Sequence, residues 1–382
     1  MSEEGKSEKK LTIAHIMPWS GVGGVEIATL RLMDTTRDQF RHVAFCLHDA
    51  TPLRNSLEKM GIETITYSPP VPSLRHAVKY YKESLAVKRQ LQAIGADIVH
   101  FSEINAAEFN SLAAVLAQCR LVSHVRNTYS HLGPRQRLPL LLVHSFIFVS
   151  KESMQRFAIS LPDNKARVVY DAIELPDLDI AANNAAVRQE LRIPAGCSVV
   201  GTVARVNPQK DYFTLAAAAA EVLSRHPNTR FLIVGDNSLV ELNREHYKEV
   251  ARELNKFGIA DNFIFTGHRS DVPRLIAAMD FCVLCTHREG FPLSILESMA
   301  MRKPVIATAV GGIPEIITPG VTGYLHQHGD SNELAGEIIS LIEDPAKTSQ
   351  LGLAAYENVR ENYSRQKFAD EMSEAYWDVM RR

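Results

Sequence analysis

Cysteine is scarce in this chain, and its placement does not suggest a disulfide framework. The 382 residues include five cysteines, an odd number, at positions 46, 119, 197, 282 and 285. This scatter fits a reducing compartment. Cys282 and Cys285 have the spacing of redox and zinc motifs, but they lie in an apolar run and no second pair occurs at ligand spacing. We therefore interpret both as packing residues of a buried strand.

An excess of charge of either sign is also absent. Lysine and arginine number 42 against 44 aspartates and glutamates, which gives a net charge of −2. Such a balance offers no overall attraction to nucleic acid or anionic lipid, and we predict no nucleic-acid partner. The apolar share of 46% and the charged share of 23% are typical of a globular enzyme.

Long hydrophobic runs are missing as well. The longest strongly apolar stretch, Leu138–Val149, is interrupted by His144 and Ser145. It is well short of the ~20 residues that span a bilayer. Residues 1–10 are polar and charged, which predicts a disordered leader and neither a signal peptide nor an anchor. We expect a soluble, cytoplasmic protein.

Two basic segments leave open a peripheral contact with the inner face of a membrane. One contains Lys79–Lys82 with Lys88 and Arg89, and the other is Arg135–Arg137, just ahead of the apolar stretch. Basic and apolar side chains together are typical of surfaces that rest on anionic lipid. The alternative interpretation is that these segments are solvated helix faces beside a core helix.

Short apolar runs alternate with longer amphipathic segments along most of the chain, and this alternation predicts the fold. Strand and helix alternation implies parallel sheets with right-handed crossovers. The predicted strands are Leu11–Met17, Val43–Leu47, Ile98–Phe101, Leu121–Val125 and Phe146–Val149, followed by Ser198–Val203, Phe231–Val234, Phe263–Thr266, Phe281–Leu284 and Pro304–Thr308. The predicted helices include Leu74–Ile94, Tyr212–Leu223, Leu239–Phe257, Glu333–Glu343 and Arg365–Met380.

The segment Glu174–Asn184 breaks this pattern, because it has no clear core face. We interpret it as the hinge between two doubly wound, Rossmann-like domains that face each other across a cleft. The first domain is predicted over residues 11–178 and the second over 185–362. The helix at 365–382 follows the second domain, and its apolar stripe must dock on another part of the molecule.

The segment from Glu289 to Glu297 (EGFPLSILE) carries the strongest functional signal. It places one carboxylate after an apolar strand and the other on the second turn of a helix, for which Pro292 suits the first position. A helix start offers unpaired N–H groups and a positive dipole end to a phosphate. Carboxylates that accept hydrogen bonds on either side of an anion site fit a nucleotide sugar, which has phosphates in the middle and hydroxyls at both ends.

Cations follow the first strand of the second predicted domain. Arg205 and Lys210 are five residues apart, between a buried strand and a helix. Arginine binds phosphate through two hydrogen bonds and lysine acts as a mobile point charge, so the pair is a candidate diphosphate clamp. Two solvated loop cations are the alternative. Because the carboxyl ends of parallel strands share one edge of a sheet, we favour the clamp.

The first predicted domain offers weaker candidates. Gly21, Gly23 and Gly24 lie between a strand and a helix, where glycine allows close backbone approach and a positive φ. Tight packing explains such a loop equally well. His124 ends a strand and can face the cleft. No P-loop, nucleophile elbow or set of metal ligands at local spacing occurs, so we predict no metal site and no cofactor.

Taken together, these motifs resemble glycosyltransferase family 4, the retaining GT-B enzymes among the group 1 glycosyl transferases. The resemblance extends over nearly the whole chain. It is carried by Gly23–Glu26, His124, Arg205 with Lys210, Gly235-Asp236, Gly267-His268-Arg269, Glu289–Glu297 and Gly311–Glu315. A departure occurs before the hinge, where Ala172 stands at the family's usual glycine, and we assign no binding role there.

The resemblance implies a role for several of the matching residues. Arg205 and Lys210 would neutralise the donor diphosphate, and the backbone of Gly290, Phe291, Pro292 and Leu293 would hold sugar and phosphate oxygens. Glu289 would bind the donor sugar and Glu297 the ribose. Gly23 and Gly24 would approach the phosphate, His124 would lie near the sugar, and Arg269 would border the base, largely through backbone atoms. The helix 365–382 would cross back onto the first domain.

The predicted reaction is metal-independent transfer of a sugar from a nucleoside diphosphate sugar to a hydroxyl acceptor, with retention of anomeric configuration. The acceptor would be a glycan or a lipid-linked glycan, as in polysaccharide biosynthesis. Two alternatives stay open: an epimerase or phosphorylase-like enzyme of the same fold, and a non-catalytic nucleotide-sugar sensor. Neither the donor nor the acceptor can be identified from the sequence.

Overall fold

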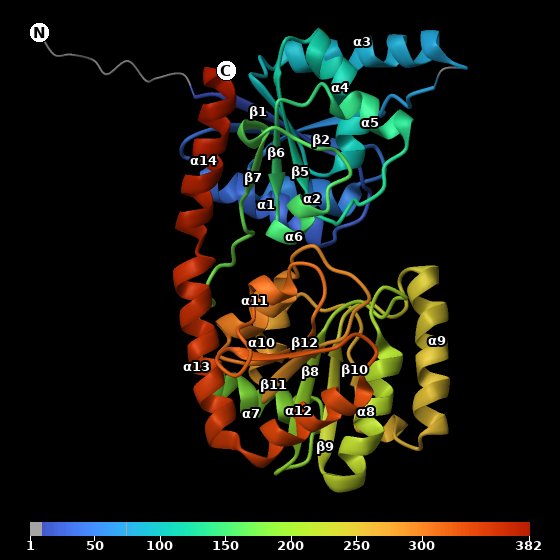
Figure 1. Cartoon of the computed structure of the whole chain (residues 1–382), viewed down its shortest axis with the longest axis vertical. Helices are drawn as coiled ribbons and strands as arrows, with labels where there is room; N and C mark the ends of the chain where they lie inside the picture. The colour runs from blue at the N-terminus through green and yellow to red at the C-terminus, as the bar shows by residue number, and fades with distance from the viewer. Residues whose placement is uncertain (1–9, 74) are drawn as a thin grey trace, which may run out of the picture. The chain divides into compact units, whose positions relative to one another are not determined.

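The computed structural model describes residues 10–73 and 75–382, so the predicted leader falls almost entirely outside the described residues. The chain divides into two compact units. Unit 1 is the part up to Ala172 together with Arg365–Arg382, and unit 2 is Ile173–Ser364 (Figure 1). The chain therefore passes from one unit to the other twice, and unit 1 is built from two separate stretches of sequence.

A seven-stranded parallel sheet forms the centre of unit 1, in the order β3-β2-β1-β4-β5-β6-β7. Its strands are β1 (Thr12–Met17), β2 (Arg41–Leu47), β3 (Glu63–Tyr67), β4 (Ile98–Phe101), β5 (Arg120–Val125), β6 (Ser145–Phe148) and β7 (Ala166–Val168). All five predicted strands of this half are confirmed. The two that the sequence pattern missed, β3 and β7, are the edges of the sheet, where side chains are only half-buried and the apolar signal is weak.

Helices connect and cover these strands. They are α1 (Gly24–Thr36), α2 (Thr51–Lys59), α3 (Ala77–Ala93), α4 (Ile104–Leu116), α5 (Pro134–Leu140) and α6 (Lys151–Gln155), with a 3-10 turn at Asp163–Lys165. From the far end of the sequence comes α14 (Arg365–Arg381). Its buried Phe368, Met372 and Tyr376 pack in one cluster with residues of β1, β4, β5 and β6. The helix is thus part of the core of unit 1. Burial of its apolar side chains stabilises the unit by about 25 cal/mol for each Å² of apolar surface removed from water.

Unit 2 is built on a six-stranded parallel sheet in the order β10-β9-β8-β11-β12-β13. Its strands are β8 (Ser198–Val203), β9 (Thr229–Val234), β10 (Phe263–Phe265), β11 (Phe281–Leu284), β12 (Val305–Thr308) and β13 (Gly323–His326). The five strands predicted for this half are confirmed. The missed strand, β13, is again at an edge, and half of its side chains are only partly buried.

The helices of unit 2 are α7 (Ile180–Glu190), α8 (Tyr212–Arg225), α9 (Glu241–Lys256), α10 (Val272–Ala277), α11 (Leu293–Ala300), α12 (Ser331–Glu343) and α13 (Pro345–Asn362). The predicted hinge over Glu174–Asn184 is wrong in its second half. The Asp179 side chain accepts a hydrogen bond from Ala182 N–H and caps α7, so residues 180–184 are helical. The unit boundary lies earlier, between Ala172 and Ile173.

Both units are thus Rossmann-like parallel sheets with helical crossovers, and the predicted α/β fold of the GT-B type is confirmed. Each sheet has a point at which the strand order reverses: between β1 and β4 in unit 1, and between β8 and β11 in unit 2. Ligands of such sheets bind beyond the carboxyl ends of the strands at this point.

Candidate functional site

The reversal point of unit 2 is where the predicted clamp and the predicted acidic segment meet. The loop after β8 and the loop after β11 pair directly through a short antiparallel bridge between Lys210 and Thr286. Asp211 N–H donates to the carbonyl of Cys285 at 3.1 Å, and His287 N–H donates to the carbonyl of Gln209 at 3.0 Å. Two segments far apart in the sequence are therefore joined into one platform at the edge of the sheet.

On this platform the side chains of Lys210 and Glu289 form an ion pair. Both are largely shielded from solvent, with 14% and 12% of the side-chain surface exposed. The two residues were predicted to bind different parts of one ligand, and the structure shows them bound to each other. A phosphate that binds Lys210 therefore meets an ammonium group that already has a carboxylate partner.

A third loop, after β12, packs against the backbone of Glu289 and Gly290. Gly311 has φ +57°, and a Cβ atom there would lie 1.8 Å from the Glu289 carbonyl oxygen. Gly312 N–H donates to the carbonyl of Gly290 at 3.1 Å. Glycine is required at 311 both for its left-handed conformation and for this close approach.

We expect Gly311→Ala to destabilise unit 2 clearly more than Gly320→Ala. Gly320 has a similar φ of +73° but nothing within 4 Å of its added Cβ. Both substitutions carry the cost of a left-handed L-residue, about 1–2 kcal/mol. Only Gly311→Ala adds the clash with Glu289, which should contribute about 1–3 kcal/mol more. Urea unfolding followed by far-UV circular dichroism measures the difference, and equal losses would contradict the proposed contact.

Helix α11 begins directly behind Glu289. Pro292, predicted as the first helical residue, is instead the N-cap, one position before the helix begins at Leu293, and no side chain caps the helix start. Phe291 and Pro292 are buried, while Leu293 is half-exposed. Glu297 lies on the second turn, as predicted, and is partly exposed. The first N–H groups of α11 and its positive dipole end are thus available to an anion.

Arg205 follows β8 on the same edge, and its side chain is exposed. Within residues 10–73 and 75–382, the Arg205 guanidinium makes no hydrogen bond or ion pair. The backbone at this point is fixed by Gly235, since a Cβ there would lie 2.1 Å from the carbonyl oxygen of Ala204. Arg205 is therefore an unpaired cation on a fixed backbone.

Arg269, by contrast, is already occupied. Its guanidinium binds Asp271 and Glu190, and Arg274 binds the same two carboxylates. Hydrogen bonds from Arg269 hold the pKa of Asp271 far below its usual range. This network ties α7 to α10 and occupies the Arg269 guanidinium. The contact of Arg269 with the base, largely through backbone atoms, stays a prediction.

In unit 1, the glycine loop caps helix α1. Glu26 accepts a hydrogen bond from Gly23 N–H at 2.8 Å and is itself buried. The expected positive φ is wrong, because Gly21, Gly23 and Gly24 all lie outside the left-handed region. An added Cβ at Gly21 or Gly24 would meet nothing within 4 Å. Neither backbone conformation nor packing explains Gly21 or Gly24. The approach of Gly23 and Gly24 to a phosphate stays a prediction.

His124 does not face open space at the end of β5, and that expectation is wrong. Its ring is completely buried and stacks on His100, with centroids 5.3 Å apart. The side chain points to the face of the sheet that α14 covers, because strand residues alternate between faces. A contact of the His124 ring with a sugar is not available in this arrangement.

His124 is the end of a row of buried histidines. His42 Nδ1 is 2.9 Å from His15 Nε2, His15 packs on His100 at 5.1 Å between centroids, and His100 Nε2 is 3.2 Å from His124 Nδ1. Tyr376 of α14 shares a hydrogen bond of 2.5 Å with His100 Nδ1. Burial lowers the pKa of all four, to about 4 for His42 and about 3 for His100.

These shifts predict that unit 1 loses stability as the pH falls below 6.5. The folded-state pKa values are depressed, so the unfolded chain binds more protons between pH 6.5 and 4. By pH 5, each of His42 and His100 should account for a loss of about 2 kcal/mol. Both tryptophans, Trp19 and Trp377, lie in unit 1 and report its unfolding. His42→Gln should flatten the pH dependence, and a stability constant from pH 7.5 to 5 would contradict the prediction.

Beside this row, Arg126 and Asp171 form a buried ion pair with exposed fractions of 4% and 6%. Both carboxylate oxygens accept from Arg126 Nη1, at 2.7 and 2.5 Å, and Arg126 Nη2 lies 3.4 Å from His124 Nδ1. Asp171 is next to Ala172, where the sequence departs from the family pattern. Its role here is to hold Arg126 at the end of β5.

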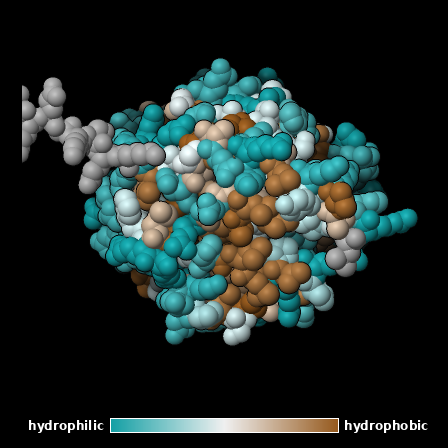
Figure 2. All heavy atoms as spheres, turned by 90° about the horizontal axis from the view of Figure 1, so that it is seen from above, coloured by the Kyte–Doolittle hydropathy of each residue, from teal (hydrophilic) through white to brown (hydrophobic). Residues whose placement is uncertain are grey.

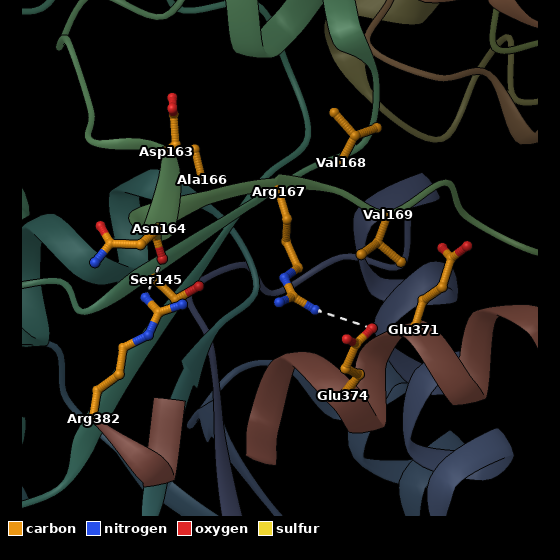
Figure 3. Close-up of a pocket in the computed structure, with 10 residues that line it drawn as sticks. All are labelled: Ser145, Asp163, Asn164, Ala166, Arg167, Val168, Val169, Glu371, Glu374 and Arg382. Atoms are coloured by element: carbon orange, nitrogen blue, oxygen red, sulfur yellow. Dashed lines mark hydrogen bonds and ion pairs between the residues drawn. The ribbon is translucent and has the colours of Figure 1, made fainter. Parts of the chain in front are cut away.

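A pocket of about 370 Å³ also occurs in unit 1, but it lies elsewhere. It is lined by the start of β6, the segment around β7 and the last turns of α14 (Figure 3). Arg167 points across it to Glu374, and Arg382 donates to the carbonyl of Asn164. Ser145 and Ala166 are the first residues of their strands. The pocket is therefore at the amino ends of these strands, away from the edge where ligands of such sheets bind.

Comparison with known proteins places this geometry in context. Residues 183–358 match the family model described as glycosyl transferases group 1. The solved structure of Alr3699/HepE from Anabaena in complex with UDP has the same fold, with a TM-score of 0.83, 23% identity, and coverage of 96% of this chain and 99% of that one. Unit 2 thus carries the region by which this family is recognised.

Among curated proteins, N-acetyl-alpha-D-glucosaminyl L-malate synthase of Bacillus anthracis is 33% identical over 154 residues, which is 40% of this chain and 39% of that protein. The UDP-Gal:alpha-D-GlcNAc-diphosphoundecaprenol alpha-1,3-galactosyltransferase of Escherichia coli is 21% identical over 88% of this chain and 89% of its own length. The match to the B. anthracis protein and to the other curated relatives most similar in sequence spans only about two fifths to half of their length.

Proposed function

We propose that this protein is a retaining glycosyltransferase of family 4, which transfers a sugar from a nucleoside diphosphate sugar to a hydroxyl acceptor. The observation that carries the proposal is the platform at the β8/β11 reversal point. There an ion pair of Lys210 with Glu289, an exposed Arg205 and the uncapped start of α11 come from separate segments to one edge. The family match over residues 183–358 supports it.

In this proposal the diphosphate takes the place of the Glu289 carboxylate at Lys210. Lys210 and Arg205 neutralise its charge, and the N–H groups at the start of α11 donate hydrogen bonds to its oxygens. The released Glu289 then accepts hydrogen bonds from hydroxyls of the donor sugar, and Glu297 from those of the ribose.

The catalytic step needs no protein nucleophile. The leaving diphosphate accepts the proton of the attacking acceptor hydroxyl on the face it leaves, which gives retention. The protein contributes orientation of the two substrates and stabilisation of the charge that develops on the diphosphate. His124, whose ring is buried, makes no contact with the sugar in this proposal.

Two incubations and a melting-temperature measurement distinguish this function from its alternatives. With donor and acceptor together, a glycosylated acceptor should form, and its anomeric configuration should match that of the donor. With donor alone, an epimerase would still convert the sugar, whereas a transferase would give only slow hydrolysis. A sensor would bind the donor, seen as a rise in melting temperature across a panel of nucleotide sugars, and would give no product in either case.

We further propose that turnover requires neither a metal ion nor a cofactor. Arg205, Lys210 and the helix start supply the positive charge that a metal would otherwise give to the diphosphate. Enzyme treated with EDTA should keep its full rate. A loss of turnover that Mg²⁺ or Mn²⁺ restores would contradict this.

For the acceptor, we propose a lipid-linked glycan that unit 1 meets at an anionic membrane surface. Figure 2 shows a band of apolar side chains on the face of unit 1 seen from above. The large apolar side chains exposed on α3, at the end of α4 and around α5 are Val78, Tyr81, Val115, Leu138, Leu141 and Leu142. These helices pack side by side, α3 on α4 and α4 on α5. No described helix is long and apolar enough to cross a bilayer.

Positive charge surrounds these side chains. Arg75, Lys79 and Lys82 are exposed beside Val78 and Tyr81, and Arg135 and Arg137 are exposed ahead of Leu138. The stretch from Leu138 was open to interpretation as a core helix, yet Leu138 and Leu141 are 69% and 62% exposed. Apolar and basic side chains on one surface complement an anionic bilayer. The E. coli relative, named for a diphosphoundecaprenol acceptor, supports this choice.

Leu141→Asp should therefore weaken sedimentation of the protein with phosphatidylglycerol-containing vesicles. A carboxylate removes apolar contact and repels the lipid headgroups, so at least a several-fold loss of the bound fraction is expected at physiological salt. The matched control is Leu239→Asp, since Leu239 is 73% exposed but belongs to unit 2. If wild-type protein fails to sediment, or if both variants lose binding equally, the surface has been assigned wrongly.

A further inference from the structure

A cluster of metal-ligating side chains lies next to the donor platform and has no part in the proposed reaction. Asp211, His287 and His328 each offer one ligand atom, and these atoms lie within 4.8 Å of one another. The sequence shows no metal-binding motif here, because the three residues are far apart in the chain and follow three different strands, β8, β11 and β13. We propose that they form a binding site for a divalent transition-metal ion, Zn²⁺ above all.

The distances suit such an ion. His287 Nδ1 is 2.7 Å from His328 Nε2, and the two rings are tilted by 57° with centroids 5.0 Å apart. Two nitrogen ligands of a tetrahedral Zn²⁺ ion, each at 2.0–2.1 Å, are about 3.3 Å apart. A small opening of the histidine pair therefore admits the ion. Two imidazoles and a carboxylate are a ligand set that zinc accepts, and a fourth position stays open to water.

The third ligand is oriented in advance. Asp211 is buried and its carboxylate accepts two hydrogen bonds from Thr214, at 3.1 Å from the backbone N–H and 2.6 Å from the hydroxyl. Hydrogen bonds of this kind fix a metal-binding carboxylate and raise the affinity of the site. Each carboxylate oxygen has a second lone pair, so capping of α8 leaves Asp211 able to bind the ion.

The ligands are also held by the platform itself. Asp211 follows Lys210, and His287 follows Thr286, so the bridge between Lys210 and Thr286 brings two of the three ligands together. Both histidines are exposed, which gives an ion a path of entry. Bound Zn²⁺ would join the loops after β8, β11 and β13 and stabilise the platform. The site does not depend on the proposed reaction, because none of its three residues is assigned to the donor.

Direct titration tests the site. Full-length protein without an affinity tag, freed of metal with EDTA and dialysed, should bind one equivalent of Zn²⁺ in isothermal calorimetry and show a higher melting temperature with Zn²⁺ than without. His287→Gln and His328→Gln should each weaken binding by about 10–100-fold or more and abolish the shift. His48→Gln, an exposed histidine of unit 1, is the matched control and should bind as wild type does.

Turnover is not the readout, so the outcome is separate from that of the proposed function. Loss of Zn²⁺ affinity in the two platform variants, with retained affinity in His48→Gln, supports the site even if no sugar transfer is found. Wild-type protein that binds no Zn²⁺ at 10-fold molar excess, or platform variants that bind as tightly as wild type, would overturn it.

Discussion

Lys210→Ala should lower kcat/KM for sugar transfer by about 10–100-fold or more. Loss of a hydrogen bond to a charged group costs about 1.5–3 kcal/mol, and each 1.36 kcal/mol is a factor of ten in rate. The variant loses the cation for the diphosphate. It also leaves Glu289, a largely shielded carboxylate, without its ion-pair partner. Initial rates at several donor concentrations, with the melting temperature measured in parallel, give the result.

The controls separate a phosphate clamp from a merely structural pair. Lys256→Ala removes an exposed lysine of α9 that pairs with Glu253 and lies over the Phe257 ring, both at the surface, and should leave the rate unchanged. Arg205→Ala removes a cation that pairs with no other described side chain, so its loss of rate, again about 10–100-fold, should come without loss of stability. If both Arg205→Ala and Lys210→Ala kept the wild-type rate, the proposed phosphate clamp would be contradicted.

Asp171→Asn should be the most destabilising of the conservative changes considered, by about 3–5 kcal/mol in unit 1. The substitution removes the charge that compensates Arg126, whose guanidinium is 4% exposed. A buried ion without its partner costs this much, whereas the intact pair adds little net stability. Urea unfolding monitored by the fluorescence of Trp19 and Trp377 reports on unit 1 directly.

A surface pair in the same unit is the matched control. Arg41 and Glu63 join β2 to β3 with a hydrogen bond of 2.6 Å, but about half of each side chain is exposed. Glu63→Gln should therefore cost at most about 1 kcal/mol. A similar loss in the two variants would show that burial of the Arg126–Asp171 pair does not set its energy.

The architecture could be predicted from the sequence because the inner strands are continuous apolar runs. Strands such as Ile98–Phe101 and Ser198–Val203 have the predicted bounds, and both are central in their sheets. Central strands of a parallel sheet are covered on both faces, so their apolar character is strong. The edge strands β3, β7 and β13 escaped prediction, because half-solvated positions mix polar with apolar residues.

At the site, the sequence indicated which side chains gather at the platform but not how they pair. Arg205, Lys210 and Glu289 were predicted because each follows a strand, and the strand ends of a parallel sheet share an edge. The ion pair between Lys210 and Glu289 depends on the conformation of two loops, which pattern does not encode. The orientation of His124 was missed for a related reason, since a position at the end of a strand leaves the face of its side chain undetermined.

The metal-ligand cluster shows a different limit. Its members are separated by tens of residues, and only the folded sheet order brings the ends of β8, β11 and β13 together. Motif spacing detects ligands on one helix or one loop. It cannot detect ligands on three loops.

The late position of α14 in the sequence has a consequence for synthesis on the ribosome. Residues 10–172 emerge first, yet the helix that covers one face of their sheet follows residues 173–364. At roughly 5–20 residues per second, that face waits on the order of ten to forty seconds for its cover. During this interval Val122, Ile147 and the row of histidines lack Phe368, Met372 and Tyr376. The nascent sheet therefore exposes apolar surface of the kind that chaperones bind. Unit 2 can complete its fold before unit 1 does.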